Sequence, residues 1–152
     1  MSWFQSKEDQ LIDEIQNGDV AKVTKLINSG ANINYRQEKG QLSPLNAAVE
    51  KRNVELIQML ISKGAEVNSK TRNGYSSLMV ALSSLECKFD VVDILIRNGA
   101  DVNAQSFKEK WSPLLLAAAQ LNANNKVIQR LVEAGALVDA SNIFGATLTC
   151  PQ

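Results

Sequence analysis

The sequence predicts an all-α fold, a solenoid of stacked helix-turn-helix units that are joined by hairpin-like turns. A glycine-alanine phrase recurs along the chain, and a serine-containing phrase recurs in phase with it. Between the two phrases lie apolar residues at helical spacing rather than in strand alternation. Self-similarity at a period of about 20–50 residues is typical of repeat architectures, in which each unit buries its apolar face against its neighbours.

The glycine-alanine phrase sets the period. It begins at Gly30, Gly64, Gly99 and Gly135, at intervals of 34, 35 and 36 residues, and is followed each time by a short polar and aliphatic segment. Each glycine comes directly after an apolar helical stretch. We therefore expect it to end that helix in the left-handed conformation, which glycine adopts without steric penalty.

The second phrase marks the start of another helix. It reads Ser43-Pro44-Leu45, Ser76-Ser77-Leu78, Ser112-Pro113-Leu114 and, more weakly, Thr147-Leu148-Thr149. Serine suits the N-cap and proline the first helical position. The helix that follows carries small residues, which let neighbouring helices approach closely, and the next helix carries an apolar stripe. The stripe residues are Leu56-Ile57 with Leu60-Ile61, Val91-Val92 with Leu95-Ile96, and Val127-Ile128 with Leu131-Val132.

These phrases divide a single domain, residues 1–152, into units of unequal length. The predicted repeats are approximately 5–34, 35–68, 69–103 and 104–139, with a truncated fifth over 140–152. Extra residues fall in the turns before Ser43 and Ser112 and between the paired helices of the third and fourth units. We expect a first helix over Asp9–Asn17, with acidic residues outside and Leu11, Ile12 and Ile15 inside. The short fifth unit leaves an end that we expect Ile143, Phe144 and Leu148 to cover, or self-association or a partner to cover instead.

Phrase, order and period together resemble the ankyrin repeat, from about Asp9 to the last residue. The resemblance implies a β-turn and two helices in each unit. It also implies a concave surface of hairpin tips and first helices that usually contacts another protein. Two family positions depart from the pattern, which predicts weaker networks between hairpin and helix. The histidine after the proline-leucine pair is replaced by Asn46, Met79 and Leu115, and the glycine before the helix start is Lys110 in the fourth unit.

Composition narrows the function classes. Sixteen Lys and Arg balance sixteen Asp and Glu, which gives no bulk attraction to nucleic acid or to an anionic membrane. The chain contains no histidine, which excludes a Ser-His-Asp or Cys-His arrangement. Cys87 and Cys150 have no zinc-ligand spacing. We therefore predict no catalytic, cofactor or metal site. The N-terminus has no signal-peptide pattern and the apolar runs are too short for a bilayer, so we expect a cytoplasmic, or at least intracellular, protein.

The hairpin tips are the candidate binding residues. Segments 35–42, 70–75 and 107–111 hold six Lys or Arg against two acids, together with four aromatic residues. Aromatic residues beside arginine and lysine are typical anchors of protein interfaces. The predicted partner-binding residues are Arg36, Lys39, Lys70, Arg72, Tyr75, Phe107, Lys108, Lys110 and Trp111.

The leading hypothesis is a non-enzymatic protein-interaction module that binds an acidic or mixed-charge surface. A narrower alternative is an inhibitor or immunity-type protein that blocks one enzyme or toxin. A nucleic-acid binder is less favoured because the basic patch is thin, and an enzyme would need a carboxylate pair or the Cys87 thiol. The Trp3-Phe4 pair is interpreted as an apolar strap over the first helices, with a docking element as the alternative.

Overall fold

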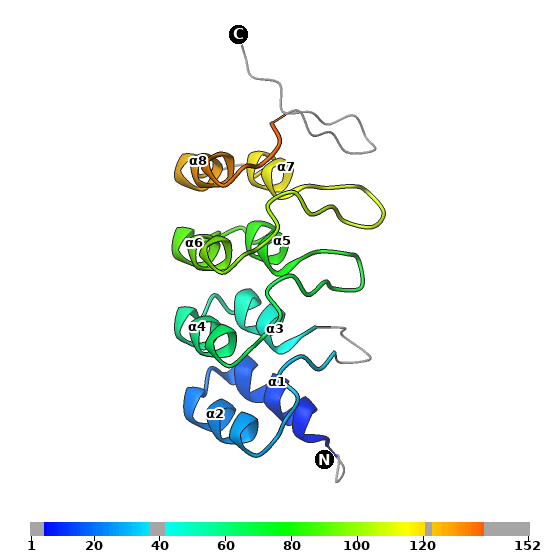
Figure 1. The fold of residues 1–152 in the computed structure, drawn as a ribbon, viewed down its shortest axis with the longest axis vertical. Helices are drawn as coiled ribbons and strands as arrows, with labels where there is room; N and C mark the ends of the chain where they lie inside the picture. The colour runs from blue at the N-terminus through cyan, green and yellow to red at the C-terminus, as the bar shows by residue number, and fades with distance from the viewer. Residues whose placement is uncertain (1–4, 37–41, 121–122, 139–152) are drawn as a thin grey trace.

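The computed structural model describes residues 5–36, 42–120 and 123–138. Over these residues the chain forms helices that stack in pairs along the long axis of the molecule (Figure 1). The helices are α1 (Lys7–Asn17), α2 (Val20–Asn28), α3 (Pro44–Glu50), α4 (Val54–Ser62), α5 (Ser77–Leu82), α6 (Phe89–Arg97), α7 (Pro113–Ala118) and α8 (Asn125–Glu133). Each pair, with the turn before it, is one unit, and we number the units one to four from α1–α2 to α7–α8. The predicted all-α solenoid is confirmed.

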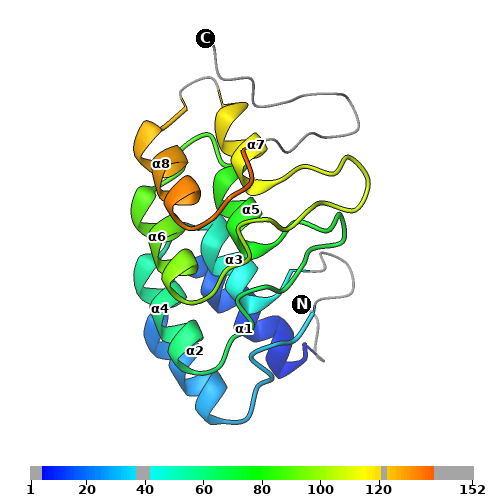
Figure 2. The same cartoon turned by 45° about the horizontal axis from the view of Figure 1, so that its top comes forward.

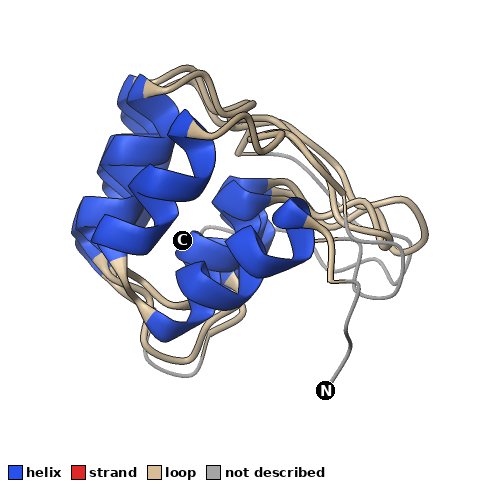
Figure 3. Cartoon of the chain, turned by 90° about the horizontal axis from the view of Figure 1, so that it is seen from below, coloured by secondary structure: helices blue, strands red, loops and turns tan. Residues whose placement is uncertain are grey.

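The helices form two layers. The first helices of the units, α1, α3, α5 and α7, lie in one layer, and α2, α4, α6 and α8 lie in the other (Figures 1 and 2). The turns between units project sideways from the first layer, as the view along the stack shows (Figure 3). In the part of the chain that the structure describes, the only ladder contact outside helices is an isolated antiparallel bridge between Lys70 and Ser76. The projecting turns are therefore hairpin-like rather than true strands.

Serine N-caps begin three of the first-layer helices, as predicted. The hydroxyl oxygens of Ser43, Ser76 and Ser112 accept hydrogen bonds from the backbone N–H three residues later, at 3.2, 3.3 and 3.2 Å. Pro44 and Pro113 occupy the first helical position, where the missing N–H would have had no partner in the helix. The first helix begins two residues earlier than predicted, because Ser6 also serves as an N-cap.

Glycine ends each second-layer helix in the predicted conformation. Gly30, Gly64, Gly99 and Gly135 have φ of 95, 97, 87 and 97°. An asparagine four residues later links three of these turns to the next unit. In unit two, the Asn68 side chain donates to the carbonyl of Gly99 at 3.0 Å and accepts from the backbone N–H of Asp101 at 2.8 Å. Asn34 and Asn103 make the same two bonds at the other boundaries, so the asparagines form a ladder along the stack.

The core is one continuous cluster that runs through the stack. Leu11, Ile12 and Ile15 of α1 are buried, as predicted. The first residue of each adjacent pair in the predicted apolar stripes is buried too: Leu56, Leu60, Val91, Leu95, Val127 and Leu131. The stripe is not uniform, because Val132 in α8 is 43% exposed. In the described part of the chain, no helix has the length and apolar character needed to cross a membrane.

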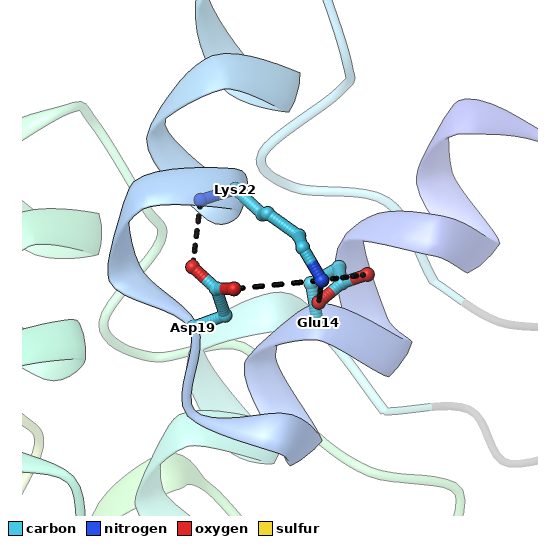
Figure 4. A network of polar contacts seen from close by, with 3 residues as sticks. All are labelled: Glu14, Asp19 and Lys22. Carbon is cyan, nitrogen blue, oxygen red and sulfur yellow. Dashed lines mark hydrogen bonds and ion pairs between the residues drawn. The ribbon is translucent and has the colours of Figure 1, made fainter.

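Two acidic residues of unit one, Glu14 and Asp19, form ion pairs with Lys22. Lys22 of α2 lies between two carboxylates, with its Nζ 3.3 Å from Glu14 Oε2 and 3.5 Å from Asp19 Oδ2 (Figure 4). A backbone hydrogen bond from Lys22 is the main cause that lowers the pKa of Asp19, and Glu14 is the main cause that raises the pKa of Lys22. The acidic residues expected on the outside of the first helix are Glu8, Asp9, Asp13 and Glu14; Asp13 is exposed, whereas the other three are half-buried.

The extra residues between the helices of unit three lie where the sequence places them. The α5–α6 connection has six residues, 83–88, against three, 51–53, between α3 and α4. Several predictions fall outside the described residues: the Trp3-Phe4 strap, Lys39, and the cover of the stack by Ile143, Phe144 and Leu148.

Candidate functional site

The turn of unit three is closed by its own backbone. The N–H of Thr71 donates to the carbonyl of Tyr75 at 2.9 Å, and the N–H of Gly74 donates to the carbonyl of Thr71 at 2.9 Å. The Thr71 hydroxyl also accepts from the N–H of Tyr75 at 3.2 Å. Gly74 takes φ of 82°, the left-handed conformation that this tight turn requires. The tip is therefore held by internal bonds rather than by a partner.

The turn of unit four closes in the same way with one residue more. Ser106 donates its N–H to the Trp111 carbonyl at 3.0 Å, and its hydroxyl accepts from the Trp111 N–H at 3.0 Å. By this pattern Ser106 corresponds to Thr71, and Lys110 corresponds to Gly74. Lys110 takes φ of 57°. A residue with a Cβ in this conformation costs about 1 kcal/mol relative to a relaxed backbone.

The tips of units three and four contact each other through Phe107. Its N–H donates to the Asn73 carbonyl at 3.0 Å, and the Nζ of Lys70 lies 5.4 Å from the centre of its ring. The ring also lies against Gly74, since a Cβ built there would be 2.6 Å from Phe107 Cγ. Phe107 therefore joins the two tips with part of its ring and still exposes 56% of its surface.

The structure brings the predicted site residues of units three and four to one edge of the stack. Arg72, Phe107, Lys108 and Lys110 are exposed, as is Arg36 of the unit-two turn. Lys70, Tyr75 and Trp111 are half-buried, and both aromatic side chains pack against the core. Because these two rings pack inward, Phe107 is the exposed aromatic anchor among the predicted site residues that the structure describes.

Charge at this edge is mainly positive. No hydrogen bond or ion pair within the described residues engages the side chains of Arg72, Lys108 and Lys110. The acid between the two lysines, Glu109, is half-buried. Burial of the Tyr75 phenol is the main cause that raises its pKa, and the Glu109 carboxylate contributes in the same direction.

Several residues that position the tips were missed from the sequence. Thr71 and Ser106 supply the hydroxyls that close the turns, and Asn73 supplies the carbonyl that holds Phe107. A hydroxyl residue placed four or five positions before each aromatic was the signal that could have identified the closing pair. Nothing local indicated the role of Asn73, because its contact is with the next unit.

One hollow in the described structure lies between the helix connections of units three and four. This cavity of about 350 Å³ is lined by Leu82, Leu85, Cys87, Ala117, Gln120 and Val127, among others. Burial raises the pKa of the Cys87 thiol, which lowers its thiolate fraction and its nucleophilicity. Within the described ranges, no group of three or more Cys, Asp or Glu side chains is placed to hold a metal ion. The cavity thus offers no recognisable catalytic arrangement.

A family model described as ankyrin repeats, in three copies, matches residues 11–106. The chain belongs to the ankyrin repeat family. Ankyrin repeats are in general protein-protein interaction modules, and the family is typically non-enzymatic.

Known proteins match the chain at modest identity. The chain is 32% identical to human ankyrin repeat and SOCS box protein 6, over 82% of this chain and 31% of that protein. It is 32% identical to the putative palmitoyltransferase ZDHHC13 of Danio rerio, over 88% of this chain and 20% of that protein. It is 34% identical to human 2-5A-dependent ribonuclease, over 47% of this chain and 10% of that protein. The chain therefore spans less than a third of the length of each of these relatives.

Proposed function

We propose that this ankyrin chain is a non-enzymatic binding module that holds a partner protein, through its hairpin tips and the adjoining first-layer surface. The partner presents an acidic or mixed-charge surface to the exposed cations of units two to four. Phe107 serves as the apolar anchor, and Arg72, Lys108 and Lys110 set orientation and association rate.

The observation that carries this proposal is the linked pair of tips in units three and four. The Phe107 N–H bond to Asn73 and the closing bonds at Thr71 and Ser106 fix the tips before any partner arrives. A preorganised surface loses little conformational entropy on binding, so more of the contact energy becomes affinity. An exposed aromatic ring together with exposed cations on the same tips is typical chemistry of a protein interface.

The test compares two baits that carry the same change in net charge. In the first, Arg72→Glu and Lys108→Glu reverse two tip cations. In the second, Lys25→Glu and Lys63→Glu reverse two exposed cations of the second layer, on α2 and at the end of α4. Proteins retained from the source lysate by the unmodified chain are quantified on each bait after nuclease treatment.

We expect the tip reversal to lower the retained amount of a bound protein by at least about tenfold. The second-layer reversal should leave that amount unchanged. Phe107→Ala should weaken retention of the same protein, because it removes the exposed anchor. Equal retention on both charge-reversed baits would contradict the tip assignment. Release of the retained material by nuclease alone would indicate nucleic acid instead.

A further inference from the structure

Two non-glycine residues in the described part of the chain have positive φ, and both are cations. They are Arg52, with φ of 54°, and Lys110, with φ of 57°. In each case another unit of this chain has glycine at the corresponding place. Gly18 precedes the N-cap Asp19 as Arg52 precedes the N-cap Asn53, and Gly74 precedes Tyr75 as Lys110 precedes Trp111. The chain therefore places a strained cation where glycine fits without strain.

At Arg52 the molecule itself shows what the side chain does. Its guanidinium Nη1 lies 3.2 Å from Ser84 Oγ and 3.0 Å from Glu86 Oε2. These contacts hold the six-residue α5–α6 connection of unit three against unit two. A glycine at this position would relax the backbone but release that connection, so the strain at Arg52 is offset inside the chain.

At Lys110 no such contact exists within the described residues. Its side chain is exposed and makes no hydrogen bond, ion pair or ring contact there. The neighbouring acid, Glu109, is half-buried, and its charge contributes to the raised pKa of Tyr75. Lys108, on the other side of Glu109, is another exposed cation. The backbone strain at Lys110 is thus not offset by its side chain within the described structure. Backbone strain that no contact within the protein compensates is typical of functional sites, including ligand-binding sites.

We propose that Lys110 is the specificity-determining cation of the tip surface, and that it contacts a carboxylate of an acidic peptide segment in the partner. This inference rests on the proposed function and names the chemistry of one contact within it. Lys110 and the exposed ring of Phe107 belong to the same turn of unit four, so the segment carries an acid near an apolar residue. In the free protein Lys110 strains its turn, and in the complex its charge is paired.

The experiment uses the full chain and a random dodecapeptide display library as the probe. Peptides are selected on the wild-type chain, and the best binder is synthesised, together with versions in which each acid is replaced by its amide. Affinities are then measured for wild type, Lys110→Gly, Lys110→Asn and Lys110→Arg. Arg52→Gly is the matched control, because it replaces the other strained cation.

We expect Lys110→Gly to melt a few degrees higher than wild type and to bind the peptide about tenfold more weakly. Lys110→Asn should bind as weakly as Lys110→Gly, because asparagine tolerates this backbone but lacks the charge. Lys110→Arg should keep wild-type affinity, and Arg52→Gly should also bind as wild type. One acid-to-amide change in the peptide should weaken binding to wild type but cause no further loss of affinity in Lys110→Gly. That acid is then the carboxylate that pairs with Lys110.

Opposite signs for stability and affinity separate a binding role from a structural one. Wild-type affinity in Lys110→Gly, or no rise in its melting temperature, would overturn the inference. If Lys110→Gly binds normally but Arg72→Glu does not, the proposed function stands and only the role of Lys110 fails. If the selected peptides are indifferent to Arg72→Glu and to Phe107→Ala as well, the tip surface itself is wrong. Selection of peptides without acids also contradicts the assignment.

Discussion

The boundary between units two and three differs in chemistry from the boundary between units three and four. At the first boundary, Ser77 of α5 donates its hydroxyl to Asn46 Oδ1 of α3 at 2.5 Å, and both side chains are fully buried. At the second boundary, the corresponding residues are Met79 and Pro113, which have no side-chain hydrogen-bonding group to pair. At this one position of the repeat, the two–three boundary has a buried polar pair and the three–four boundary has apolar side chains.

At the two–three boundary, two departures from the repeat pattern pair with each other. Asn46 replaces the family histidine in unit two, and Ser77 replaces the proline of the serine-proline phrase in unit three. The pair still leaves Asn46 Nδ2 buried without a hydrogen-bond partner among the described residues. A buried polar group that loses its partner costs more than the bond contributes. The two–three boundary therefore depends on both residues being present.

Ser77→Pro makes unit three match units two and four, yet we expect it to destabilise the fold by about 2 kcal/mol. Proline fits the first helical position, so the backbone is not the cause. The loss comes from Asn46, whose buried amide would then have no partner for its oxygen either. Urea denaturation of the single variant measures this, and Pro113→Ser at the other boundary is the control, with an expected change of under about 1 kcal/mol.

The double variant Asn46→Leu with Ser77→Pro tests whether the pair is the cause. Replacing both partners by apolar groups removes the unsatisfied amide as well as the bond, so its stability should equal or exceed that of wild type. The effects of the two substitutions should then be strongly non-additive, as expected for residues in contact. Simple addition of the single effects would show that the two boundaries do not differ in this way.

Sequence alone predicted the parts of this comparison that depend on local pattern. Serine caps, left-handed glycines and apolar stripes follow from residues within one helix or turn, and Asn46 was recognisable as a departure from the family. Its partner was not, because Ser77 lies 31 residues away and meets it only after the units stack. The same holds for Phe107, whose position in a tip was predicted but whose contact with Gly74 was not.

The asparagine ladder gives a second measure of the two boundaries, at a place where they look alike. Asn68→Leu at the two–three boundary and Asn103→Leu at the three–four boundary each remove two hydrogen bonds to the next unit. The bonds are exposed, so water replaces part of each, and we expect a loss of about 1 kcal/mol in either variant. Equal losses of unfolding free energy in urea denaturation of the two variants would show that the boundaries differ only at the buried Asn46–Ser77 pair. A clearly larger loss at Asn68 would show that the whole two–three boundary is the more sensitive one.

Cys87 reports on the three–four boundary, because it lines the cavity between the connections of those units. Burial raises the pKa of this thiol, so at a given alkaline pH less of it is thiolate than in the unfolded chain. In a Cys150→Ser background, alkylation by iodoacetamide should therefore rise with pH later in the native chain than in urea. Arg52→Gly releases the contacts to Ser84 and Glu86 and should shift the native profile toward the unfolded one. Asn103→Leu, which leaves these contacts in place, should not.

If Arg52→Gly leaves the profile unchanged, the three–four cavity keeps its shape without help from unit two. The two boundaries would then be energetically separate. A shifted profile would instead show that Arg52, anchored in unit two, fixes a surface that belongs to units three and four. In that case the boundaries differ in chemistry but are coupled through the inserted connection. The strained backbone of Arg52 would then have a measurable effect one boundary away from where the strain is held.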